Sequence, residues 1–200
     1  MDKPKKLYLS KSAILSLWKA PHSYINNKIF GIQQPESEAM TRGKELHEVI
    51  ENHCTGLKKD PRLSSIQLTF QEKEKKIFVP YNDEYSLFGF IDMLDYRSKT
   101  FCEIKTGKVW SQRDFDNAYE IEFYALALGF RKAFLITCSQ DLSKIATRYR
   151  DIYEKDIEAV REWIDQSIIQ IEMGYEELTR DLVDGKCTGN CWFRERCHFA

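Results

Sequence analysis

Two consecutive strand-like segments that both carry acids are the feature that most restricts how this chain folds. Residues 85–95 and 100–106 are rich in apolar and β-branched residues, and a short polar turn separates them. The first segment contains Asp92, and the second contains Glu103 and Lys105. Because strands joined by a short turn usually pair with each other, we expect these three charged side chains to lie close together in one sheet.

Strand alternation predicts where these side chains point. Successive side chains of a strand lie on opposite faces, so Asp92 is expected to interrupt an apolar row. Burying an unpaired carboxylate is so costly that such a group normally pairs, takes up a proton or binds a metal. Glu103 and Lys105 are expected on one face of the second strand, with Cys102 and Ile104 on the other. The expected neighbours of Asp92 on its face are Phe88, Phe90 and Leu94.

Two interpretations of the three charged residues remain open. Asp92, Glu103 and Lys105 can form a structural ion-pair group at the end of a sheet. Alternatively, the two carboxylates are hard oxygen ligands of the kind that suit Mg²⁺ or Mn²⁺. The second interpretation predicts metal-assisted hydrolysis of a phosphodiester, with all three as catalytic residues.

Composition limits the classes of protein that remain. The chain has 200 residues, of which 42% are hydrophobic, and this is enough for one domain with a core. Thirty basic and thirty-one acidic residues give a net charge of -1, so any contact with DNA must use a local patch. We expect a cytoplasmic protein with no membrane segment, because no apolar run approaches a membrane span and lysines interrupt the N-terminal region.

Periodicity predicts helices at both ends of the chain and strands between them. We expect a short helix capped by Ser12 and three further helices over 36–53, 114–128 and 154–179. Expected strands cover 63–70, 74–80, 85–95, 100–106, 133–139 and 144–151. The fold class is α/β, with a mixed central β-sheet flanked by helices. We expect a single domain over 1–200, made of an N-terminal helical segment (1–35), a core (36–153) and a C-terminal helix with a cysteine-containing tail (154–200).

Two polar residues fall inside apolar helical patterns. His47 lies on the apolar stripe of the 36–53 helix, where a histidine is either part of the core or a third ligand beside Asp92 and Glu103. Glu120 and Tyr124 are four residues apart and therefore share a face of the following helix. Glu120 is either at a solvated edge or at a site.

Together these motifs resemble a known family. The sequence resembles the nuclease domain of RecB and the CRISPR-associated adaptation nucleases, which belong to the PD-(D/E)XK superfamily. The resemblance covers most of the chain, from about residue 12 onward, and implies a restriction-endonuclease-like core. The motifs that carry it are Arg42-Gly43-x-x-x-His47-x-x-Ile50-Glu51, Gly89-x-x-Asp92, Glu103-x-Lys105-Thr106-Gly107 and Glu120-x-x-x-Tyr124.

The resemblance implies a role for each matching residue. His47, Asp92 and Glu103, with the carbonyl oxygen of Ile104, would hold Mg²⁺ or Mn²⁺. Lys105 would position or activate the attacking water and offset charge on the phosphorane. The substrate strand would lie near three further residues, which are Arg42, Glu120 and Tyr124.

The sequence also departs from the family pattern. Glu120 stands where the family usually has glutamine, and Ala20 replaces an N-terminal cysteine that, in relatives with an iron–sulfur cluster, acts with three C-terminal cysteines. Cys187, Cys191 and Cys197 remain, and two interpretations stay open. The three thiols bind an iron–sulfur cluster or Zn²⁺ with a fourth ligand, or they are reduced remnants of a lost site. Candidate fourth ligands are His22, His198 and Cys54.

Two functional hypotheses follow. The first is a DNA nuclease that cuts single strands or DNA ends without sequence preference, since no base-reading module is visible. Its setting would be recombination, repair, viral DNA processing or CRISPR adaptation. The protein would act alone, as a homo-oligomer or with a partner protein. The second is a non-catalytic DNA-binding or complex-forming subunit that retains the fold. Aromatic residues expected to stack on unpaired bases are Trp110, Phe115, Tyr119 and Tyr124.

Overall fold

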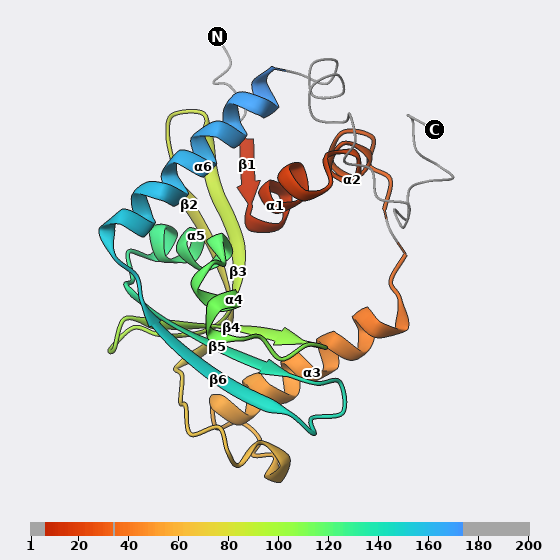
Figure 1. The fold of residues 1–200 in the computed structure, drawn as a ribbon, viewed down its shortest axis with the longest axis vertical. Helices are drawn as coiled ribbons and strands as arrows, with labels where there is room; N and C mark the ends of the chain where they lie inside the picture. The colour runs from red at the N-terminus through yellow and green to blue at the C-terminus, as the bar shows by residue number, and fades with distance from the viewer. Residues whose placement is uncertain (1–6, 34, 174–200) are drawn as a thin grey trace.

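The structure, a computed structural model, describes residues 7–33 and 35–173. The described elements form one mixed sheet with helices against both of its faces (Figure 1). In chain order they are β1 (Leu7–Ser10), α1 (Lys11–Lys19), α2 (Pro21–Tyr24), the π-helix η1 (Ile25–Ile29), α3 (Glu38–Cys54), the 3₁₀ helix η2 (Pro61–Leu63), β2 (Glu72–Pro80), β3 (Tyr85–Asp95), β4 (Thr100–Thr106), α4 (Gln112–Asp116), α5 (Tyr119–Leu128), β5 (Lys132–Cys138), β6 (Ile145–Asp151) and α6 (Glu154–Glu172).

Strand order confirms the expected mixed sheet. The order is β1-β3-β4-β5-β6, and β2 pairs with the other edge of β3. The pairs β1–β3 and β4–β5 are parallel, while the remaining pairs are antiparallel. Because β2 occupies one edge of β3, β1 and β4 must share the other. They pair with 85–88 and 93–95, and between them 89–92 has no ladder partner on that edge.

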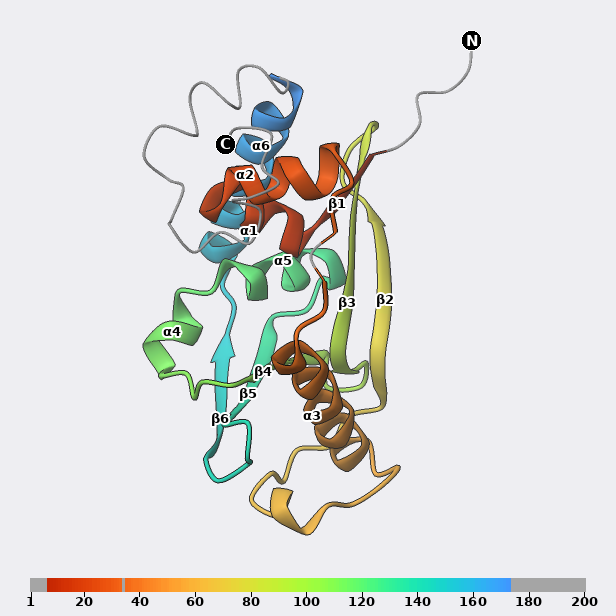
Figure 2. The same ribbon diagram turned by 90° about the vertical axis from the view of Figure 1, so that its right-hand side faces the viewer.

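Helices cover the two faces of the sheet differently. Helices α1, α5 and α6 lie together on one face, where the larger apolar core forms around residues such as Leu87, Ile91 and Phe101 (Figure 2). Helix α3 packs on the other face over β4 and β3, and Ile50 and Ile104 both belong to a second core on that side. Helix α3 meets β3 near Asp92 and Met93, and the rest of that face, formed by β1, the start of β3 and the end of β2, carries no described helix.

Three sequence-based predictions of local structure were wrong. Residues 63–70 form no strand: after η2 the segment is irregular, and its apolar side chains fill the core under α3. The helix expected over 114–128 is two helices, α4 and α5, with a break at Asn117. The N-cap of α1 is Ser10 and not Ser12, and its Oγ accepts the Ala13 N–H. Ser10 is also the last residue of β1, a strand of four residues that is too short for periodicity to reveal.

Of the three residues expected to share a face with Asp92, Leu94 lies elsewhere. Phe88 and Phe90 lie on the side that α3 leaves open, whereas Leu94 is fully buried in the core on the opposite side. Strict alternation therefore fails between Asp92 and Leu94. The β2–β3 pairing passes from Lys73–Met93 to Lys75–Ile91 and skips Glu74 and Asp92, and Glu74 has a φ of 48°, so the ladder is irregular at this point. Among the described residues, no helix is long and apolar enough to cross a membrane.

Candidate active site

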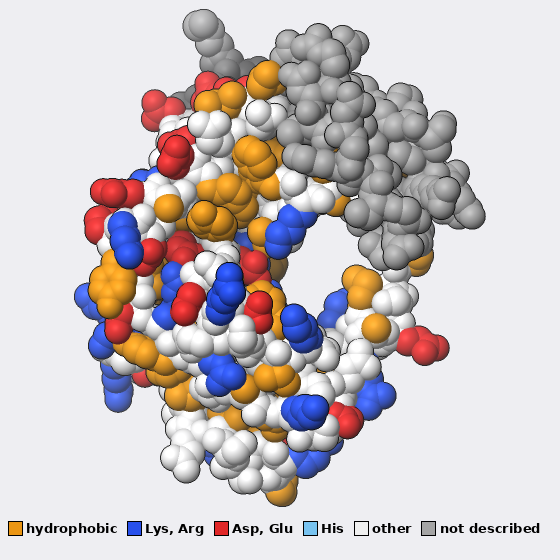
Figure 3. Space-filling view, in the orientation of Figure 1, with side chains coloured by type: hydrophobic (Ala, Val, Ile, Leu, Met, Phe, Trp, Pro, Cys, Tyr) orange, Lys and Arg blue, Asp and Glu red, His pale blue; other side chains and the backbone are white. Residues whose placement is uncertain are grey.

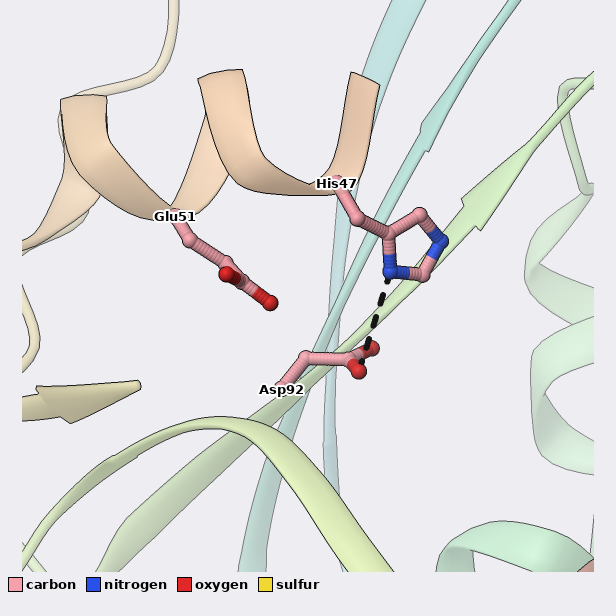
Figure 4. A group of neighbouring side chains, drawn as sticks. All are labelled: His47, Glu51 and Asp92. Atoms are coloured by element: carbon pink, nitrogen blue, oxygen red, sulfur yellow. Dashed lines mark ion pairs between the residues drawn. The ribbon is translucent and has the colours of Figure 1, made fainter. Parts of the chain in front are cut away.

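Helix α3 and strand β3 bring together an imidazole and two carboxylates (Figure 4). Ser37 caps α3 by accepting the Met40 N–H, which fixes where the helix begins. His47 and Glu51 are one turn apart, so both face Asp92 on the strand below. One ligand atom from each of the three lies within 4.8 Å of the others, and His47 Nδ1 is 3.7 Å from Asp92 Oδ1.

The burial of Glu51 indicates that a cation fits this group. Glu51 is only 2% exposed, its Oε2 has no hydrogen-bond partner among the described residues, and Lys73 Nζ is 3.8 Å from it. Burial and the charge of Asp92 raise the pKa of Glu51 to about 7. A buried carboxylate oxygen without a donor carries a desolvation cost that a metal ion would offset. One nitrogen and several carboxylate oxygens suit Mn²⁺ or Mg²⁺.

Asp92 is oriented by the backbone of the next strand. The N–H of Ile104 donates to Asp92 Oδ2 over 2.6 Å. This bond forms because β3 and β4 stop pairing after Met93 and Cys102, so the side chain reaches an amide that would otherwise be in the ladder. Burial and the nearby charge of Glu103 raise the pKa of Asp92. Ile104 thus joins the site through its amide, while the role expected for its carbonyl stays a prediction.

Glu103 is held by two lysines. Its Oε1 is 2.6 Å from Lys11 Nζ and 2.7 Å from Lys105 Nζ. Burial alone would raise the pKa of Glu103, but the two ammonium groups lower it to about 2. Glu103 and Lys105 point to the same side of β4, as predicted, and Cys102 and Ile104 lie in the core under α3. Among the described residues, the group of candidate metal ligands thus includes Glu51, while metal binding by Glu103 stays a prediction.

Lys105 also contacts Glu120. Its Nζ is 2.8 Å from Glu120 Oε1 and lies 5.8 Å from the ring centroid of Trp110. Glu120 is buried on α5, so it is not at a solvated edge. Burial would lower the pKa of Lys105, but the carboxylates of Glu103 and Glu120 outweigh it and raise that pKa. The result is a chain of alternating charges from Lys11 through Glu103 and Lys105 to Glu120.

Tyr124 contacts residues 89–92 of β3, the segment that has no ladder partner on the edge shared by β1 and β4. Its hydroxyl donates to the Phe90 carbonyl over 2.6 Å, and its side chain is only 3% exposed. A Cβ at Gly89 would lie 3.0 Å from Tyr124 Cε1, so the ring needs glycine at that position. Tyr124 therefore lies beneath the site and supports the strand that carries Asp92. Its contact with substrate stays a prediction.

Arg42 lies on another side of α3. The pocket that contains His47, Glu51 and Asp92 has a volume of about 870 Å³. Arg42 lines a second groove of about 530 Å³, which also includes acids of α3 and of the β5–β6 turn. Contact between Arg42 and a phosphate at the metal group stays a prediction.

Sequence reasoning gave no role to two residues of this site. Glu51 was part of a motif, and its spacing of four from His47 would have been sufficient to propose it as a ligand. Lys11 had no such signal, because its partner Glu103 is 92 positions away and only the parallel pairing of β1 with β3 brings α1 to it.

The cysteine tail cannot be placed in this site. Cys187, Cys191 and Cys197 lie outside the described residues, as does His198. Cys54, one candidate fourth ligand, is a free thiol buried in the core under α3, and burial raises its pKa to about 11. A neutral, enclosed thiol of this kind is typical of a structural cysteine.

Comparison with solved structures shows the fold. The chain is similar to SSO0001 (14% identity, TM-score 0.60), with 92% of this chain and 89% of that chain covered. It is also similar to LHK-Exo, an alkaline exonuclease from Laribacter hongkongensis, in a structure with dAMP (15% identity, TM-score 0.57, 88% and 93% covered). A phage-related exonuclease from Haemophilus somnus 129PT gives 12% identity and a TM-score of 0.50, with 82% and 83% covered. No protein-family model and no curated protein sequence matches the chain. The mixed α/β fold is thus one that exonucleases use.

Proposed function

We propose that this protein is a divalent-metal-dependent deoxyribonuclease. The observation that carries the proposal is the convergence of His47, Glu51 and Asp92 on one pocket, with the buried Glu103–Lys105 pair on the adjoining strand. Glu51 Oε2 is buried with no hydrogen bond among the described residues and only Lys73 Nζ at 3.8 Å, so a bound cation would stabilise it. The exonuclease fold of the structural neighbours supports the same chemistry.

Each residue has a distinct task in this proposal. His47, Glu51 and Asp92 would hold Mg²⁺ or Mn²⁺, which supplies Lewis-acid polarisation of a phosphate oxygen and a more acidic bound water. The Ile104 amide fixes the Asp92 carboxylate. Glu103 keeps the Lys105 ammonium beside the pocket, where it can orient water and offset the negative charge that grows on the phosphorane.

The proposed substrate is a DNA single strand or a DNA end, cut without sequence preference. Acidic and basic side chains are intermixed on the face in Figure 3, as the net charge of -1 leads one to expect. A protein without a broad basic surface holds DNA by local contacts near its active site. The similar LHK-Exo structure is a complex with dAMP, a nucleotide of the type that DNA hydrolysis releases. Recombination, repair, viral DNA processing and CRISPR adaptation are the settings in which this activity would serve, with a homo-oligomer or a protein partner as proposed forms.

End-labelled oligonucleotides test the chemistry. We expect degradation of labelled single-stranded DNA with Mg²⁺ or Mn²⁺ and none with EDTA. Asp92→Ala, Glu103→Ala and Lys105→Ala should each lower the rate by about 10²-fold or more. Lys132→Ala, an exposed lysine at the start of β5, is the control and should cut like the wild type. Unchanged cutting by all three site variants would refute the proposal.

One observation favours a second function, a DNA-binding subunit that does not cut. Lys105 is already paired with two carboxylates, Glu103 and Glu120, which leaves it less available to a phosphate. A gel-shift experiment with Mn²⁺ separates the two functions. A shifted but intact oligonucleotide favours the binding subunit, and shortened products favour the nuclease.

A further inference from the structure

Four aromatic rings lie in two contacting pairs on the part of β1, β3 and β2 that no described helix covers. Phe88 and Phe90 of β3 are in edge-to-face contact with ring centroids 5.6 Å apart. Tyr8 of β1 and Phe78 of β2 meet across β3 with centroids 5.1 Å apart, and Phe78 is the direct register partner of Phe88. We call these four residues, Tyr8, Phe78, Phe88 and Phe90, the aromatic row.

Most of the aromatic row is exposed. Tyr8, Phe78 and Phe90 are 61%, 51% and 53% exposed, and no described helix packs on this end of the face (Figure 2). By contrast, Phe115 and Tyr124, which the sequence suggested as base-stacking residues, are buried. Exposed contiguous apolar surface on a protein usually marks a binding site.

The aromatic row leads directly to the candidate metal group. Phe90 lines the same 870 Å³ pocket as His47, Glu51 and Asp92. Helix α3 covers the face up to Met93, Asp92 lies at the edge of that cover, and Phe90 and Phe88 follow beyond it. A ligand on the aromatic row would therefore be continuous with whatever occupies the metal pocket.

Charge and area favour nucleic acid over a second copy of this chain. Lys76 Nζ lies 5.4 Å from the Phe88 ring centroid, which places a cation beside the rings for a phosphate. Three half-exposed aromatic side chains present on the order of 300 Å², well under the roughly 800 Å² that each partner of a stable complex buries. The outer edge of β2, which pairs with no other described strand, carries Lys75 and Pro80, which disfavour strand addition by another chain.

We propose that the aromatic row binds an unpaired DNA strand by base stacking and delivers it to the metal pocket. The inference rests on the nuclease function proposed above. Stacking on aromatic rings accepts any base, so it matches cutting without sequence preference. Duplex DNA, whose bases are already stacked, would gain little from the rings.

Binding measured without metal tests this proposal separately from cleavage. Binding of a labelled oligothymidylate in EDTA is measured by fluorescence anisotropy. The double variant with Tyr8→Ala and Phe78→Ala should bind at least about tenfold more weakly than the wild type, since stacking is worth about 1–3 kcal/mol per base. The matched control is Tyr153→Ala, because Tyr153 is also 61% exposed and has a lysine over its ring, Lys155 at 6.0 Å. Thermal melting checks that each variant is folded.

The outcomes are distinct. Weakened binding in the double variant alone, with Asp92→Ala still binding but not cutting, supports both proposals. Weakened binding together with a wild type that does not cut keeps the aromatic row as a binding surface and removes the nuclease function. Wild-type affinity in the double variant overturns the aromatic-row proposal even when cutting is normal. Dissociation of a wild-type dimer by the double variant, with DNA affinity unchanged, assigns the row to a second copy and also overturns it.

Discussion

Lys11 and Lys105 contact the same oxygen of Glu103, Oε1, at 2.6 and 2.7 Å. The Lys11 ammonium also lies 4.6 Å from the ring centroid of Tyr124. Helix α1 is thereby attached to β4, the strand that carries two of the proposed catalytic residues, Glu103 and Lys105. Two cations on one buried carboxylate keep it ionised, and removing either leaves the other to do so alone.

Lys11→Ala should therefore impair both stability and cleavage. Removing one partner of a buried pair costs about 3–5 kcal/mol when the other is left alone, and because Lys105 still contacts Glu103 we expect about 1–2 kcal/mol. Cleavage should fall about tenfold as Glu103 and Lys105 lose their fixed positions. Lys19→Ala, an exposed lysine at the end of the same helix, is the control. Denaturant unfolding and initial cutting rates measure the two effects, and equal values for both variants would contradict this role.

Glu120→Gln should improve substrate binding. Replacing an anion 2.8 Å from Lys105 with a neutral amide frees the ammonium for a phosphate and removes repulsion near the pocket. We expect KM to fall about three- to tenfold with a smaller change in kcat. Steady-state kinetics on a single-stranded substrate measure this. A rise in KM would show that Glu120 itself has a positive role, for example as an additional ligand.

The raised pKa of Glu51 predicts a pH-dependent stability. Its ordinary value is 4.5, and in the folded protein it is about 7. A raised pKa means that folding favours the protonated acid, so the contribution is full below 4.5 and is lost as pH rises through 7. In EDTA, the free energy of unfolding should fall between about pH 5 and pH 8 by on the order of 1–3 kcal/mol.

The matched variant and added metal check that sign. Glu51→Gln should flatten most of the fall, while the raised pKa values of His47 and Asp92 act in the same direction and leave a remainder. Mn²⁺ should stabilise the wild type more at about pH 8 than at about pH 6, because metal ions bind ionised carboxylates. Thermal melting across this range measures both effects, and metal stabilisation that decreases with pH would contradict them.

Tyr124 should behave as a supporting residue. Tyr124→Phe removes the hydrogen bond to the Phe90 carbonyl and should cost about 1 kcal/mol of stability. Gly89→Ala should cost about 1–3 kcal/mol because its Cβ would press on the Tyr124 ring. The Phe variant should retain most of its cutting rate under conditions where it is folded. A loss above about a hundredfold in a stable Phe variant would instead indicate a direct contact with substrate.

Local patterns were sufficient for the parts of the site that lie close together in sequence. The β3–β4 hairpin and the shared side of Glu103 and Lys105 follow from strand alternation and a short turn. These predictions were confirmed because neighbouring residues determine them.

Features that depend on tertiary pairing could not be predicted from the sequence. Lys11 reaches Glu103 only because β1 pairs in parallel with β3, a strand far along the chain. Alternation predicted Leu94 beside Asp92, but the irregular pairing opposite Glu74 turns it to the other core. The 63–70 segment has a strand-like apolar pattern, yet its side chains are buried by filling space beneath α3.

The division of the proposed ligands between two elements has a mechanical consequence. His47 and Glu51 belong to α3, and Asp92 belongs to β3. An ion bound by all three would form a non-covalent cross-link between the helix and the sheet. Amide hydrogen exchange in α3 should therefore slow when Mn²⁺ is added, so that the same ion that serves catalysis also rigidifies the pocket around it.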